Sequence, residues 1–218
     1  MENPSKTVSS KQQATHPRLP ELLARYRSSR WQEPLAPHNA QAIAQLDSLL
    51  SNDQRPLVLD SFCGTGLSTQ LLAARHRDCL VVGIDKSGHR LAKTEGDAGQ
   101  NYVLLRAECE PIWRHLAQNG RTLAAHYLLY PNPWPKPGHL QRRVHGHPAF
   151  SELISLGGNV EVRSNWQLYI EEFGLAMSIS GHCGRVSRVD AGEPLTLFER
   201  KYRDSGHALW SFIANIPV

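Results

Sequence analysis

From Arg55 to the C-terminus, short apolar runs alternate with stretches of helical periodicity. The apolar runs predict strands over 57–60, 79–84, 102–106, 126–130, 159–163, 184–189 and 208–213. Helices are predicted over 67–77, 87–98, 111–118, 150–156 and 165–179. Strands that alternate with helices form mainly parallel sheets, because each helix carries the chain back to the starting edge. The sequence therefore predicts an α/β fold, with a doubly wound, mainly parallel seven-stranded sheet and helices on both faces. No clear helical pattern separates the last two strands, so they are expected to form an antiparallel pair at one edge.

The chain before this alternating region divides into two parts. Residues 1–18 are rich in Ser, Lys, Gln and Thr, and they predict a disordered basic tail. Residues 19–55 predict an N-terminal helical segment with helices over 20–30 and 39–50. The remaining residues, 56–218, form the main domain.

Composition excludes several protein classes. No apolar run approaches the roughly 20 residues needed to span a bilayer, and the polar N-terminus does not read as a secretory signal. The four cysteines are scattered without a Cys-x-x-Cys pair, which favours a reduced, cytoplasmic protein. The net charge of +4 and the isoelectric point of about 9.0 fit a polyanionic partner, and they fit an ordinary soluble surface equally well.

A short glycine-containing loop follows the first predicted strand and opens the first helix. It runs from Asp60 to Gly66, and Gly64 and Gly66 would let the backbone approach a ligand closely. Thr69 stands where a dinucleotide-binding loop would have a third glycine. The loop alone is also compatible with an ordinary turn.

Acidic residues follow three successive predicted strands, and they strengthen the case for a ligand. Asp85 ends the second strand, where a carboxylate would accept the ribose hydroxyls of a nucleoside. Glu108 follows the third strand, near the expected place of an adenine ring, and Asp60 ends the first. Together with the loop, these acids predict a site for a nucleoside cofactor.

The segment after the fourth predicted strand is Pro131-Asn-Pro-Trp-Pro-Lys136. Three prolines in five residues fix an extended, stiff loop, which would hold Asn132 and Trp134 over the cofactor. A purely structural turn is the alternative.

A basic stretch, 138–147, follows this loop directly. Its Arg142 and Arg143 suit contacts with phosphates. His145 and His147 have the spacing of a pair of metal ligands, but no further ligand cluster accompanies them, so no metal is expected.

Three motifs resemble those of the bacterial tRNA (guanine-N7)-methyltransferase family. The first is PNPWPKPGHLQRR at 131–143, where the family has Pro-Asp-Pro-Trp, then Lys and a basic run ending in Arg-Arg. The second is SNWQLY at 164–169, where the family has Thr-Asp-Trp-x-x-Tyr. The third is TLFE at 196–199, followed by Gly206-His207 and Trp210. These similarities run in order over about 57–213.

The resemblance implies a Rossmann-like class I methyltransferase that uses S-adenosylmethionine, with tRNA as its partner. It implies a cofactor site formed by Asp60, Gly64, Gly66, Asp85, Glu108 and Asn132. Asn132 takes the place of the family's active-site aspartate. The implied substrate contacts are Trp134, Lys136, Arg142, Arg143, Asn165, Thr196, Phe198 and Glu199. A monomer is favoured.

Two departures from the family bear on the substrate. Asn132 and Asn165 stand where the family has aspartates. A carboxylate can accept the N1–H and N2–H of guanine together, whereas an asparagine has one acceptor oxygen and adds donors. The resemblance therefore supports the fold and the cofactor more strongly than it supports guanine as the substrate. Three functions stay open: nitrogen methylation of RNA, with tRNA guanine N7 as the leading target; nitrogen methylation of another base or of a small heterocycle; and a catalytically silent RNA-binding module.

Overall fold

The computed structural model describes residues 4–29, 31–94, 101–189 and 192–217. Its strands are β1 (Leu57–Ser61), β2 (Leu80–Asp85), β3 (Tyr102–Arg106), β4 (Ala125–Leu129), β5 (Gly158–Ser164), β6 (Arg185–Arg188) and β7 (Trp210–Ile216). Its α-helices are α1 (Leu19–Arg27), α2 (Pro37–Asn52), α3 (Leu67–Arg75), α4 (Gly88–Leu91), α5 (Cys109–Gln118), α6 (Phe150–Ser155), α7 (Gln167–Ile179) and α8 (Leu197–Asp204). Two 3₁₀ turns, η1 (Pro137–Arg142) and η2 (Val144–Gly146), follow the proline-rich loop.

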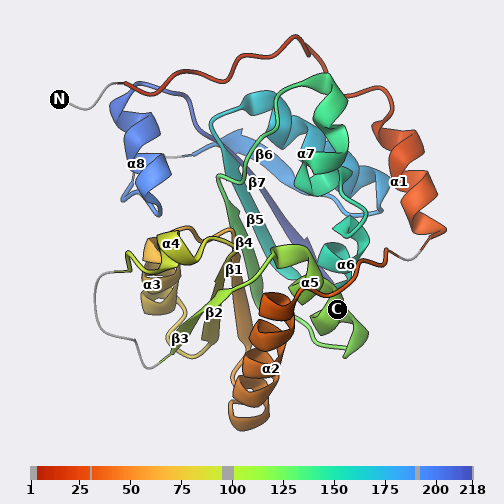
Figure 1. Cartoon of the computed structure of the whole chain (residues 1–218). Helices are drawn as coiled ribbons and strands as arrows, with labels where there is room; N and C mark the ends of the chain where they lie inside the picture. The colour runs from red at the N-terminus through yellow and green to blue at the C-terminus, as the bar shows by residue number, and fades with distance from the viewer. Residues whose placement is uncertain (1–3, 30, 95–100, 190–191, 218) are drawn as a thin grey trace.

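The strands form one seven-stranded sheet in the order β3-β2-β1-β4-β5-β7-β6. The first five strands are parallel to one another, and β7 runs antiparallel to both β5 and β6. The predicted α/β fold with a doubly wound, mainly parallel seven-stranded sheet is confirmed. Figure 1 shows this sheet in the middle of the molecule with helices around it.

The two faces of the sheet are buried unequally. Leu57 and Leu59 of β1 belong to the large core that α1, α2, α5, α6 and α7 cover, whereas Val58 packs with Leu72 of α3 on the other face. Successive side chains of a strand point to opposite faces, so one continuous apolar run serves both layers.

One helix was not predicted. α8 lies between β6 and β7, where the sequence shows no apolar periodicity, and its one buried residue is the charged Glu199. A helix held by buried ion pairs instead of an apolar stripe escapes a search for hydrophobic periodicity. The predicted helix over 87–98 is helical at Gly88–Leu91, and residues 95–100 lie outside the described residues.

The prediction of a disordered tail is wrong for residues 4–18. This segment runs across the top of the molecule from the α8 side to α1 (Figure 1). Ser5 donates its backbone N–H to Ser205, and Gln12 and His16 bond the buried Glu172. We call residues 4–18 the N-terminal strap. None of the described helices has the length and apolar character needed to cross a bilayer.

Candidate functional site

The glycine loop after β1 has the strained backbone that a close approach requires. Phe62, Gly64 and Gly66 all have positive φ angles, of 65°, 63° and 81°. The φ of Gly66 is one that favours glycine, and a Cβ there would also lie 2.6 Å from the side chain of Leu104 on β3. The backbone N–H of Gly64 donates to Asp85 Oδ2 at 3.0 Å, which ties the loop to the end of β2.

Asp85 and Glu108 both line a cleft of about 530 Å³ at the carboxyl ends of the strands. Asp85 is 2% exposed, and its Oδ1 accepts the Ser87 N–H at 2.8 Å and pairs with Arg90 at 3.1 Å. Burial favours the protonated form of Glu108, but hydrogen bonds with His38 and Asn39 outweigh it and lower the pKa. Glu108 Oε2 lies 2.6 Å from His38 Nε2, so the start of α2 belongs to the site.

Asp60 lies beneath the glycine loop and does not line the cleft. It is fully buried, and Ser68 and Thr69 donate to its Oδ2 at 2.6 and 2.7 Å. Its Oδ1 is buried without a hydrogen-bond partner among the described residues. Burial raises the pKa of this carboxyl to about 6, against the effect of the two hydroxyl donors. From this place Asp60 supports the loop and the start of α3, and its predicted role in the cofactor site stays a prediction.

The proline-rich loop forms the opposite wall of the cleft. Tyr130 and Trp134 have positive φ angles of 57° and 45°, and prolines on both sides of Asn132 stiffen the backbone between them. Asn132 Oδ1 accepts the Trp134 backbone N–H at 3.3 Å. The guanidinium of Arg142 lies 4.9 Å from the centre of the Trp134 ring. Asn132, Trp134 and Arg142 all line the cleft.

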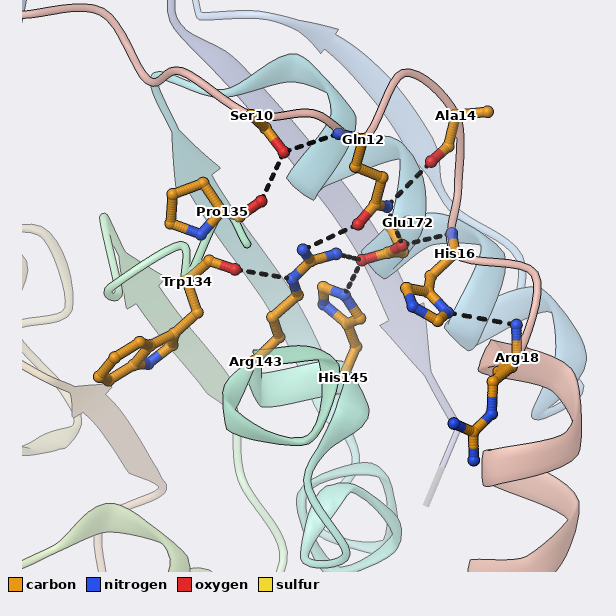
Figure 2. Close-up of polar contacts among 10 residues, drawn as sticks. All are labelled: Ser10, Gln12, Ala14, His16, Arg18, Trp134, Pro135, Arg143, His145 and Glu172. Atoms are coloured by element: carbon orange, nitrogen blue, oxygen red, sulfur yellow. Dashed lines mark hydrogen bonds and ion pairs between the residues drawn. The ribbon is translucent and has the colours of Figure 1, made fainter. Parts of the chain in front are cut away.

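Arg143 does not lie on the surface, so the predicted phosphate contact is wrong for this residue. Its side chain is fully buried and forms an ion pair with Glu172 of α7. Its Nε donates to the Trp134 carbonyl at 3.2 Å, and its Nη2 donates to Gln12 of the strap at 2.9 Å. Figure 2 shows the arginine joining the loop, the strap and α7. We call Arg143, Glu172, His145 and Gln12 the buried ionic cluster.

His145 belongs to this cluster. Its spacing from His147 in the sequence is that of a pair of metal ligands, but its side chain contacts Glu172. Its Nε2 lies 2.8 Å from Glu172 Oε2, and both side chains are fully buried. Burial favours a protonated Glu172, but the hydrogen bonds and charges of His145 and Arg143 outweigh it and lower the pKa to about 2. His147 packs edge-on against Trp31 instead.

Some residues of the third motif, 196–199, stabilise α8, and others line the cavities. Thr196 caps α8 by accepting the Glu199 N–H at 2.9 Å, and it borders a second cavity of about 490 Å³. Glu199 is fully buried and pairs with Arg163 at 3.0 Å, so its predicted contact with substrate is wrong. Phe198 is 46% exposed and lines both cavities, which places an aromatic face between them.

Four other predicted residues have distinct places. Gly64 borders the second cavity, whereas Gly66 faces the side chain of Leu104 on β3. Asn165 follows β5 directly and lines the first cavity. Lys136 is exposed just before η1, outside the residues that line the first cavity.

The structure adds site residues that sequence reasoning missed. Arg90 and Tyr202 line the first cavity, and His38 and Asn39 hold Glu108. Arg90 lay in a helix predicted only by periodicity, and Tyr202 lay in the missed α8. His38 and Asn39 lie at the start of the helix predicted over 39–50. That position alone does not predict their contact with Glu108, which follows β3.

Comparisons with known proteins agree with this geometry. Residues 54–212 match the family model described as "Putative methyltransferase". The tRNA (guanine-N(7)-)-methyltransferase of Nitrosococcus oceani is 28% identical over 171 residues, which cover 73% of this chain and 71% of that protein. The protein of the same name from Aeromonas hydrophila is 29% identical, covering 73% of each.

Solved structures share the fold at lower identity. The structure of the 16S rRNA methyltransferase KamB aligns with a TM-score of 0.59 and 19% identity, covering 87% of this chain and 97% of that chain. The structure of an antibiotic-related methyltransferase aligns with a TM-score of 0.56 and 14% identity, covering 85% and 97%.

Proposed function

This chain belongs to the methyltransferase family matched over residues 54–212, and on that premise we propose that it methylates a nitrogen of RNA, with guanine N7 of tRNA as the leading target. It is an S-adenosylmethionine-dependent enzyme with a Rossmann-like α/β fold. We propose that this domain spans residues 56–218 and that residues 19–55 form an N-terminal helical segment. S-Adenosylmethionine supplies a methyl group made electrophilic by its sulfonium. We expect the enzyme to act as a monomer in the cytoplasm.

The observation that carries the proposal is the lining of the cleft, in which carboxylates follow β2 and β3 whereas amide and aromatic side chains follow β4 and β5. Asp85 and Glu108 present carboxylates at the ends of β2 and β3, where the ribose hydroxyls would donate to Asp85 and the adenine ring would lie near Glu108. Asn132, Trp134 and Asn165 form the other end, at the ends of β4 and β5. This arrangement supports a cofactor lying along the strand ends with its reactive end facing the proline-rich loop.

The chain's own residues would act mainly by positioning. Guanine N7 carries an exposed lone pair and needs no base before it attacks a methyl group. Holding that lone pair in line then supplies most of the rate enhancement. Trp134 and Phe198 offer aromatic faces on which a base can stack, and Asn132 offers an amide to its edge.

The basic surface beside the loop supports an RNA partner. Arg142 and Lys136 are exposed there. Arg18 and Arg25 of the neighbouring α1 region line a surface hollow that η1 borders through Pro137, Gly138, Leu140 and Gln141. Lys and Arg side chains of this kind neutralise phosphates. Asn132 and Asn165 stand where the family has carboxylates, and this difference favours a second candidate function. That function is methylation of a small nitrogen heterocycle or of another base.

The experiment is a transfer assay with labelled S-adenosylmethionine and total RNA, followed by digestion and mass spectrometry of the nucleosides. Label is expected in 7-methylguanosine from the tRNA fraction. Asp85→Ala is the loss-of-binding variant, and Asp78→Ala, an exposed residue before β2, is the matched control. A protein that binds the cofactor but leaves all RNA unlabelled would overturn the RNA proposal in favour of a small acceptor.

A further inference from the structure

A chain of hydrogen bonds that starts in the N-terminal strap sets which atom of the Asn165 side-chain amide faces the cleft, the oxygen or the NH₂ nitrogen. His207 Nε2 lies 2.9 Å from the backbone carbonyl of Ser5, and a carbonyl oxygen can only accept. The Nε2 atom of a neutral His207 therefore carries the proton, and its Nδ1 is an acceptor. Asn165 Nδ2 lies 3.2 Å from that Nδ1, so the amide NH₂ points to His207. The amide oxygen is left for the cleft that Asn165 lines.

Stacking fixes the plane of the His207 ring. Tyr202 lies against it with ring centres 5.4 Å apart and an interplanar angle of 12°, and Phe198 stacks on Tyr202 at 26°. The ring is thus held between α8 and the strap, and its two nitrogens keep their directions.

Asn132 has the opposite polarity for an equally definite reason. Its Oδ1 accepts the Trp134 backbone N–H, which can only donate. The NH₂ of Asn132 is therefore the group free to face the cleft. The two asparagines follow neighbouring parallel strands: Asn132 lies three residues after β4 and Asn165 lies directly after β5. One presents a donor and the other presents an acceptor.

We propose that His207 is a specificity-determining positioning residue, and that the Asn132–Asn165 pair selects a base edge carrying a hydrogen-bond acceptor next to an N–H donor. This inference rests on the proposed function. In guanine the edge is O6 facing Asn132 and N1–H facing Asn165. The N2 amine has no partner in this pair, unlike in a pocket of carboxylates, which would accept N1–H and N2–H together. Because O6 and N7 share one side of the purine, an Asn132 bond to O6 brings N7 toward the cofactor end of the cleft.

The tautomer is tested without any substrate. Long-range ¹H–¹⁵N NMR of the labelled full chain separates protonated from unprotonated imidazole nitrogens, and His207→Gln assigns the signals. His207 is expected to have a protonated Nε2 and an unprotonated Nδ1. A proton on Nδ1 would turn the Asn165 oxygen away from the cleft and overturn the inference, whether or not RNA is methylated.

The edge is tested with RNA transcripts whose target guanosine is replaced. Inosine keeps O6 and N1–H, so kcat/KM is expected to change by less than the roughly tenfold loss that one unmade hydrogen bond causes. 2-Aminopurine lacks O6 and N1–H and is expected to lose about tenfold to a hundredfold. An inosine transcript that loses as much as 2-aminopurine would show that N2 is recognised and overturn the inference.

Protein variants complete the test. Asn132→Asp replaces the cleft-facing donor with an acceptor, so kcat/KM on guanosine RNA, measured at saturating S-adenosylmethionine, should fall by about tenfold or more. Asn119→Asp, at the exposed end of α5, is the matched control. Faster guanine methylation by Asn132→Asp would overturn the inference. The expected tautomer together with unlabelled RNA would instead place the fault in the proposed function.

Discussion

Arg143 and Glu172 form an ion pair in which neither side chain has any exposed surface. They come from the turn after the proline-rich loop and from α7, and they meet beneath the acceptor end of the cleft. The pair alone leaves further hydrogen-bonding capacity unused, because a carboxylate accepts about four bonds. His145, Gln12 and the His16 backbone fill those positions, the last at 2.6 Å (Figure 2). The strap is therefore held in place by a buried charge.

Glu172→Gln is expected to lower the free energy of unfolding by about 3 kcal/mol or more. The change removes one charge of a buried pair and leaves the Arg143 guanidinium uncompensated. Urea unfolding followed by circular dichroism measures the effect. Glu171→Gln, its exposed neighbour, is the control and should change stability by less than about 0.5 kcal/mol. A loss below about 1 kcal/mol for Glu172→Gln would mean that the pair is replaceable.

Asp60 is expected to make stability fall as the pH rises from about 4 toward 6. Its pKa is raised from 3.8 to about 6 by burial, so the folded state binds a proton that the unfolded state has already released. The stability that this proton provides is fully present below the pKa of Asp60 in the unfolded state. It is lost as the pH rises through the pKa of Asp60 in the folded state. Asp60→Asn removes the titration, so the variant should gain stability relative to the wild type across that interval. A pH-independent difference between the two proteins would refute the raised pKa.

Asp85→Ala is expected to weaken S-adenosylmethionine binding by about tenfold to a hundredfold, the range for losing hydrogen bonds to a charged group. The variant also frees the Gly64 N–H, so part of the loss would come from a looser loop. Isothermal titration calorimetry measures the affinity, and circular dichroism verifies the fold. Asp78→Ala should bind as the wild type does. Equal affinities in two folded proteins would remove Asp85 from the cofactor site.

Arg142→Ala is expected to weaken RNA binding and to reduce the slope of log affinity against log salt by about one. Its guanidinium is exposed over Trp134, where a phosphate can reach it. Filter binding over a salt series measures the slope. Arg77→Ala, exposed after α3, removes the same charge away from the cleft and should leave the slope nearly unchanged. Identical slopes for the two variants would argue against a phosphate at Arg142.

The sequence by itself determined the sheet and, to within one residue, the ends of β1 to β6, whereas β7 was predicted over 208–213 and spans Trp210–Ile216. Leu57–Leu59 and the run at 79–84 are apolar on both faces, which is the signature of a central parallel strand. Side chains that follow such strands must gather at one edge, so Asp85, Glu108 and Asn132 could be placed together from their positions alone. The three motifs added the methyltransferase family.

Only the tertiary structure decided which polar residues face the cleft and which are buried. Arg142 and Arg143 are adjacent and chemically alike, yet one lies over Trp134 and the other is buried against Glu172. Glu172 lies 29 positions from Arg143 and 160 from Gln12, and no local pattern encodes contacts at those separations. The strap and α8 escaped prediction for the same reason. Their stability comes from pairing with buried charges contributed by distant parts of the chain, and sequence periodicity records only the apolar face of an element.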